Sequence, residues 1–175
     1  MAKWKIDPSH SEIGFKVRHL MITNVKGNFR KFDLTVETEN EDFVNPKIDF
    51  IAKTASIDTG DQKRDEHLKS ADFFDSAHYP DMKFISTGYE RVDKENYNLY
   101  GDLTIKNKTK PVQLKVNFAG IVKDPYGNTK AGFTIEGTIN RKDWDLNWNA
   151  ALETGGVLVS DEVKITCDVQ LVKES

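Results

Sequence analysis

The sequence contains a single cysteine, Cys167, among its 175 residues. One cysteine cannot close a disulfide within the chain, so a hydrophobic core has to stabilise the fold, and a chain of this length can build one. No run approaches the roughly 20 consecutive apolar residues that a membrane-spanning helix needs. The opening residues also lack the apolar stretch of a secretory signal. The sequence therefore predicts a soluble, cytoplasmic protein with one domain over residues 1–175.

An excess of positive charge is missing as well. The chain has 25 basic and 28 acidic residues, which gives a formal net charge of −3. This balance provides no strong cationic field for the backbone of a nucleic acid, so we expect no nucleic-acid partner. Hydrophobic residues at 38% and charged residues at 30% favour a globular chain over a disordered one.

The sequence patterns of common catalytic and metal centres are also absent. None of the four histidines has the HExxH spacing or belongs to a paired Cys/His pattern. No serine lies in a G-x-S-x-G elbow, and no glycine-rich loop has the form that binds phosphates. Cys167 lies within an alternating apolar run, which favours a small core residue over a nucleophile. We therefore predict no catalytic residue, no metal ligand and no cofactor.

What the sequence does contain is alternation of apolar and polar residues over most of its length. A period of two, typical of strands with one buried face, occurs in eight runs, at residues 13–19, 31–37, 47–57, 82–92, 97–106, 112–118, 133–139 and 163–171. A shorter alternation at Trp4 and Ile6 precedes them. Most connections are too short for a crossover helix, so the strands should pair antiparallel. Long strands of this kind predict an all-β protein, an eight-stranded antiparallel up-and-down barrel, because closure removes exposed edges. A two-sheet sandwich is the alternative.

One segment, residues 61–75, interrupts this pattern with good helix formers and a candidate N-cap at Asp61. We expect a short helix there that lies across one end of the sheet, with Arg64 and Asp65 capping it or anchoring it to the barrel. Trp144 and Trp148 fall in the connection before the last strand. They either plug the barrel end or form part of a ligand entrance, and the sequence does not separate these roles.

The side chains on the inward face indicate what the barrel could hold. Eight-stranded barrels are either filled by side chains or hold one small ligand. A long tube with apolar walls suits a hydrocarbon chain, because burial of each CH₂ contributes about 0.8 kcal/mol. We predict that the tail of an amphipathic lipid is bound by residues at inward positions of the runs, namely Phe15, Val17, Phe50, Leu103, Leu114, Val116 and Phe118. His19 is predicted to contact the polar head, with a buried histidine bonded to backbone as the alternative. Arg18 is a second candidate, although the alternation directs it outward.

Several motifs resemble, in the same order, those of the YceI-like family. They include W-x-I-D-P-x-H-S at residues 4–11, F-K-V-R-H-L at 15–20, V-K-G-N-F at 25–29, R-D-E-H-L at 64–68, Y-P-D-M-K-F at 79–84 and G-D-L-T-I-K at 101–106. The resemblance spans essentially the whole chain. It implies a lipocalin-like eight-stranded barrel that binds a polyisoprenoid or similar amphipathic lipid, with no established catalysis. Trp144 and Asp145 depart from the R-x-D-F-G-L pattern of many relatives, and many relatives also carry a secretion signal.

The leading hypothesis is therefore a non-enzymatic carrier or store of an isoprenoid-type lipid, with transient contact to a membrane surface. Two alternatives remain open. The first is a hydrolase or isomerase that acts on such a lipid with His19 or His67 as the acid or base. The second is a barrel filled by its own side chains that acts through its surface. The sequence leaves the oligomeric state open, a homodimer included.

Overall fold

The structure is a computed structural model that describes residues 2–20, 22–39, 43–149 and 159–174. Its strands are β1 (Ala2–Ile6), β2 (Glu12–His19), β3 (Thr23–Phe29), β4 (Phe32–Thr38), β5 (Lys47–Lys53), β6 (Ile57–Asp58), β7 (Asp81–Arg91), β8 (Asn96–Ile105), β9 (Lys108–Lys123), β10 (Thr129–Asn140) and β11 (Glu162–Lys173). The helix is α1 (Gln62–Lys69), and short 3₁₀ turns are η1 (Pro8–His10), η2 (Thr54–Ser56) and η3 (Arg141–Trp144). No helix of the described part of the chain has both the length and the apolar character to cross a membrane.

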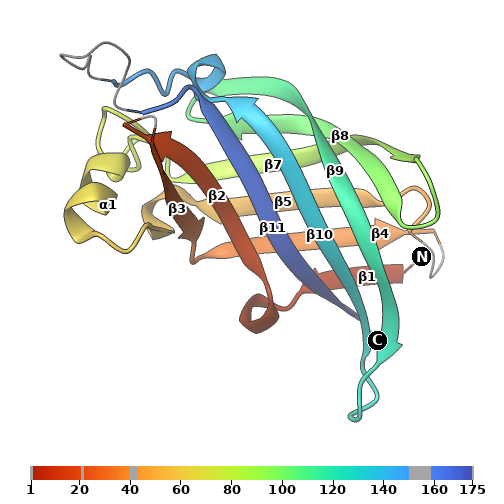
Figure 1. The fold of residues 1–175 in the computed structure, drawn as a ribbon. Helices are drawn as coiled ribbons and strands as arrows, with labels where there is room; N and C mark the ends of the chain where they lie inside the picture. The colour runs from red at the N-terminus through yellow and green to blue at the C-terminus, as the bar shows by residue number, and fades with distance from the viewer. Residues whose placement is uncertain (1, 21, 40–42, 150–158, 175) are drawn as a thin grey trace.

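The strands form one closed antiparallel barrel (Figure 1). We call each of the barrel's continuous strands a wall. Three walls are bent and have two parts: β1 continues into β2, β3 into β4 and β5 into β6. The first two walls pair through β1 with β4 and through β2 with β3, and the pairing of β1 with β11 closes the ring. With each bent strand counted once, the barrel has eight strands in up-and-down order. The predicted all-β barrel is confirmed, and the sandwich alternative is excluded.

Two walls are longer than the main runs of alternation. The first begins at Ala2 and includes the shorter alternation noted at Trp4 and Ile6, and the second begins at Thr23 instead of Lys31. The turn η1 interrupts the first wall, where the Asp7 side chain accepts a hydrogen bond from the Ser9 amide. In β3 the inward position 27 is a glycine, which lies under the Phe15 ring. A glycine carries no hydrophobic signal, so this strand escaped detection.

The helix is shorter than predicted and lies across one end of the barrel (Figure 1). The Asp61 side chain caps it as expected, accepting hydrogen bonds from the amides of Lys63 and Arg64. It ends at Lys69 instead of residue 75, because the Ser70 backbone is extended and both the amide and the hydroxyl of Ser70 donate to the His67 carbonyl. A serine that bonds to nearby backbone in this way competes with helical hydrogen bonds.

The predicted anchoring of the helix by Arg64 and Asp65 is also confirmed. Both side chains hold Thr59, which directly follows β6. Asp65 accepts from the amide and hydroxyl of Thr59 at 2.9 and 2.5 Å. Arg64 donates to the Thr59 hydroxyl and carbonyl oxygens, each at 2.8 Å. Four hydrogen bonds thereby join α1 to the barrel wall.

Four aromatic side chains close the opposite end of the barrel, and we call them the aromatic floor: Trp4, Phe43, Phe118 and Phe133. The ring centroids of Trp4 and Phe43 lie 4.8 Å apart, and those of Phe43 and Phe133 lie 4.9 Å apart. Phe118 stacks on Phe133 at 5.0 Å. Contacts of this kind are favourable beyond the area that the rings bury.

Candidate functional site

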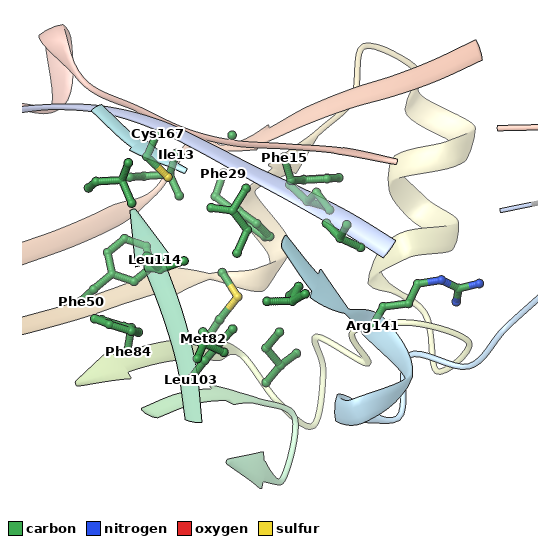
Figure 2. A pocket seen from close by; sticks show the side chains of 18 of the residues that line it. Ile13, Phe15, Phe29, Phe50, Met82, Phe84, Leu103, Leu114, Arg141 and Cys167 are labelled. Atoms are coloured by element: carbon green, nitrogen blue, oxygen red, sulfur yellow. The ribbon is translucent and has the colours of Figure 1, made fainter. Parts of the chain in front are cut away.

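A cavity of about 540 Å³ lies inside the barrel, between the aromatic floor and α1. Its volume falls within the roughly 300–1,000 Å³ range of small-molecule sites. Figure 2 shows that the labelled side chains from several strands, among them Phe15, Phe50 and Leu114, surround a common space with carbon atoms. A barrel filled by its own side chains would not leave a cavity of this size.

Two glycines in the wall help to keep the cavity open. A Cβ atom built on Gly101 would overlap the Phe84 ring, and one built on Gly137 would overlap the Leu114 side chain. The bulky side chains therefore lie across the glycines of neighbouring strands, along the wall and not across the lumen. This arrangement explains how a barrel rich in phenylalanine retains an internal space.

Seven of the eight predicted site residues line this cavity: Phe15, Val17, His19, Phe50, Leu103, Leu114 and Val116. The eighth, Phe118, does not line it, because the cavity stops at the aromatic floor to which Phe118 belongs. The second head-group candidate, Arg18, is exposed and lies outside the lining, as the alternation indicated. The binding role of the seven residues stays a prediction.

The lining also includes residues of α1 and of the β10–β11 connection. From α1 come Lys63, Arg64 and His67, and from the connection comes Trp148, one of the two tryptophans considered for a ligand entrance. The sequence analysis did not predict Lys63 or Arg64 as lining residues. The His67 ring meets the Trp148 ring edge-on at 4.7 Å, and its Nε2 lies 2.8 Å from an Asp72 carboxylate oxygen. The R-D-E-H-L motif marked this segment, but strand alternation cannot show which helical side chains face the lumen.

Arg141 holds the β10–β11 connection in place. Its side chain is only 3% exposed, and its guanidinium donates to the carbonyl oxygens of Leu146, Trp148, Val159 and Ser160. Burial lowers the pKa of this guanidinium below its ordinary value, whereas the nearby Asp161 carboxylate acts in the opposite direction. Because two of these carbonyls precede β11 and two follow η3, Arg141 fixes Trp148 relative to the barrel.

The two tryptophans of this connection have different positions. Trp144 is 2% exposed, does not line the cavity, and donates from Nε1 to the Leu103 carbonyl at 2.8 Å. It is therefore packed outside the lining of the lumen. Trp148 lines the cavity beside α1. A role of Trp148 in a ligand entrance stays a prediction.

The cavity reaches the surface beside α1, because Lys63 is exposed and also contributes to its lining. We call this region the mouth and define it by five lining residues: His19, Lys63, Arg64, His67 and Trp148. From the mouth to the floor the walls are mainly aliphatic and aromatic. The arrangement can enclose a long apolar molecule and place a polar end at the mouth.

Cys167 also lines the cavity, on β11. Burial raises the pKa of its thiol to about 11, so the group stays protonated near neutral pH and is a poor nucleophile. Within residues 2–20, 22–39, 43–149 and 159–174, no group of three His, Cys, Asp or Glu side chains could hold a metal ion.

Comparison with known proteins places this barrel in a family. Residues 4–171 match the YceI-like domain. A UPF0312 protein of Staphylococcus epidermidis is 39% identical over 171 residues, which are 97% of each chain. The crystal structure of a Campylobacter jejuni YCEI protein is similar with a TM-score of 0.79 and 33% identity, over 97% of this chain and 96% of that one. A polyisoprenoid-binding domain from Saccharophagus degradans shares the fold, with a TM-score of 0.72 at 12% identity over 98% of each chain. The chain belongs to the YceI-like family.

Proposed function

We propose that this protein binds a long-chain isoprenoid or similar amphipathic lipid in its barrel and carries or stores it without changing it chemically. The observation that carries this proposal is the cavity of about 540 Å³, closed by the aromatic floor and open at the mouth. The Saccharophagus degradans domain, described as polyisoprenoid-binding, has the same fold and gives further support.

The chemistry of the walls favours a hydrocarbon tail as the ligand. Each CH₂ group that moves from water into this lumen contributes about 0.8 kcal/mol, and the tail needs no hydrogen bonds along its length. Polar side chains gather at the mouth, where a head group would lie. This division between an apolar tube and a polar opening matches an amphipathic molecule with one long chain.

The geometry gives little support to the hydrolase or isomerase alternative. His67 is hydrogen-bonded to Asp72 and packs against Phe73 and Trp148, so it forms part of the mouth wall. The Cys167 thiol is protonated and lies on the wall of the lumen. We therefore propose binding and release as the activity, with His19 as a contact for the head group.

Mass spectrometry of an organic extract tests this proposal. The protein is purified from its native host, because a foreign host can load a foreign lipid. We expect a long-chain lipid in up to equimolar amount. Empty extracts from repeated preparations, together with no binding of a prenyl alcohol to the purified protein, would contradict the proposal.

A further inference from the structure

The outer face of the sheet formed by β2, β3 and β11 carries three lysines side by side. Lys16 on β2 lies directly opposite Lys26 on β3 and directly opposite Lys164 on β11. We call these three residues the lysine row. Like charges directly opposite each other in a sheet are destabilising. The row therefore lowers the stability of the isolated barrel, and an anionic partner would relieve this repulsion.

The charge of the lysine row is not neutralised within the described part of the chain. The three ammonium groups form no ion pair or hydrogen bond with the described residues. Arg18 is exposed on the same outer face, two residues after Lys16, and its guanidinium has no partner there either. Of the nearby acids, Asp58 already pairs with Arg30 at 2.9 Å, and Glu162 lies on β11 two residues before the row. The free cations around the row therefore outnumber the free acids, although the whole chain has a formal net charge of −3.

The turn that joins β2 to β3 adds exposed apolar side chains at the end of this face. Leu20 is 38% exposed and Ile22 is 74% exposed. The φ angle of Leu20 is 55°, in the left-handed region that favours glycine, so the turn itself does not require a leucine. The Ile22 amide donates to the His19 carbonyl at 3.2 Å, and the His19 side chain lines the cavity. The turn therefore lies beside the mouth, at the α1 end of the barrel (Figure 1).

We propose that this face, formed by the lysine row, Arg18 and the β2–β3 turn, docks on an anionic lipid bilayer. The inference rests on the proposed lipid-binding function and names the partner with which the barrel exchanges its ligand. Apolar side chains that enter the bilayer interface and cations that contact anionic head groups together give a reversible attachment. A nucleic acid would attract the cations but would not bury Leu20 and Ile22, so the exposed turn favours a bilayer. Docking by this face brings the mouth to the membrane.

Vesicle sedimentation tests the docking. The protein is mixed with vesicles of phosphatidylcholine alone and with vesicles in which about a third of the lipid is phosphatidylglycerol. At low salt, the partition coefficient should be on the order of a hundredfold higher for the anionic vesicles, at roughly fivefold per lysine of the row. The preference should fall at high salt, because screening weakens exposed charges.

A triple variant locates the preference on the lysine row. Lys16→Gln, Lys26→Gln and Lys164→Gln together should abolish most of the preference, while thermal melting shows a fold at least as stable as the wild type, because the opposed like charges are gone. The matched control replaces three exposed lysines between β7 and β9 by glutamine, namely Lys83, Lys94 and Lys115. It changes the net charge equally and should keep the preference.

A second variant tests the apolar turn. Ile22→Ser should lower the partition coefficient on anionic vesicles about tenfold, since its side chain no longer enters the interface. The control is Val122→Ser, which removes a side chain that is 66% exposed on β9. Val122 lies near the β9–β10 hairpin, at the end of the barrel opposite α1 (Figure 1). This control should bind both kinds of vesicle like the wild type.

The outcomes separate this inference from the proposed function. Equal binding to neutral and anionic vesicles, or a full preference in the triple variant, overturns the docking. An equal loss in the lysine control or in Val122→Ser would mean a general surface effect and would also overturn it, as would tighter binding to an oligonucleotide than to anionic vesicles.

Binding of geranylgeraniol without vesicles is measured in parallel. The triple variant should bind this prenyl alcohol like the wild type, because the lysine row lies outside the cavity lining. Loss of the alcohol by the triple variant would contradict a role confined to docking. Failure of the wild type to bind any prenyl lipid counts against the proposed function, whereas the vesicle experiment alone decides the docking.

Discussion

A substitution at one residue, Val116 on β9, can distinguish an open lumen from a lumen filled by side chains. It is 4% exposed and lines the cavity, while its neighbour Lys115 is exposed. In a filled core, Val116→Trp would cost about 1–3 kcal/mol or more through overpacking. We expect a loss below about 1 kcal/mol, because the ring can occupy the cavity, together with less lipid per folded molecule. Urea unfolding and mass spectrometry of extracts measure the two effects.

Lys115→Trp is the matched control, since the same ring is added one residue away on the outer face. It should change neither the stability nor the lipid content. Severe destabilisation by Val116→Trp with unchanged lipid content would show that the lumen is solid at this level and that a ligand lies elsewhere.

Cys167 provides a chemical probe of the same cavity. Its pKa is raised from 9.0 to about 11, so near pH 8 its thiolate fraction is roughly a hundredfold below that of a free thiol. Alkylation by N-ethylmaleimide should therefore be slow at pH 8 and accelerate about tenfold per pH unit up to the pKa. A bound lipid should slow it further, because the thiol lines the lumen. Equal rates in loaded and extracted protein would place the lipid away from β11.

The connection from η3 to β11 is an element whose conformation depends on one buried side chain. Arg141→Ala removes the donors of four carbonyl oxygens. An unsatisfied buried acceptor costs about 1–3 kcal/mol, so the free energy of unfolding should fall by at least about 2 kcal/mol. The adjacent Lys142→Ala removes only an exposed ion pair with Asp161, worth about 0–1 kcal/mol. Urea titration compares them, and equal losses would contradict the structural role of Arg141.

The elements of the barrel differ in how far the sequence predicts them. A strand with one buried and one solvent-exposed face alternates apolar and polar residues over a short stretch of sequence. This alternation located at least part of every wall of the barrel. The signal failed in β3, where Gly27 takes an inward position, and in α1, where Ser70 ends the helix early. In both places a contact distant in sequence or a local side-chain bond decided the outcome, and neither has a periodic signature.

At the scale of the whole molecule, the candidate site also has a part that the sequence predicts and a part that it does not. Its apolar wall follows from the inward positions of strands, and seven of eight predicted residues line the cavity. The mouth depends on how α1 and the β10–β11 connection pack against the barrel, through Thr59 and Arg141. These bonds join residues only five and seven positions apart, Arg64 with Thr59 and Arg141 with Trp148, but side-chain bonds of this kind have no periodic signature in the sequence. The floor depends on a contact between distant segments, since the Phe43 ring meets the Phe118 ring.

The stability of the whole barrel should depend on whether a lipid is bound in it. A ligand that binds only the folded state at a hundred times its dissociation constant stabilises it by about 2.7 kcal/mol. For a domain of this size that corresponds to a rise of roughly 5–10 °C in Tm. We expect extracted protein to melt lower than loaded protein by this amount, and readdition of the extracted lipid to restore the Tm. Val116→Trp should show a smaller shift, because its lumen is partly occupied by the new ring. Identical melting of extracted and reloaded wild-type protein in calorimetry would mean that the cavity does not hold the lipid.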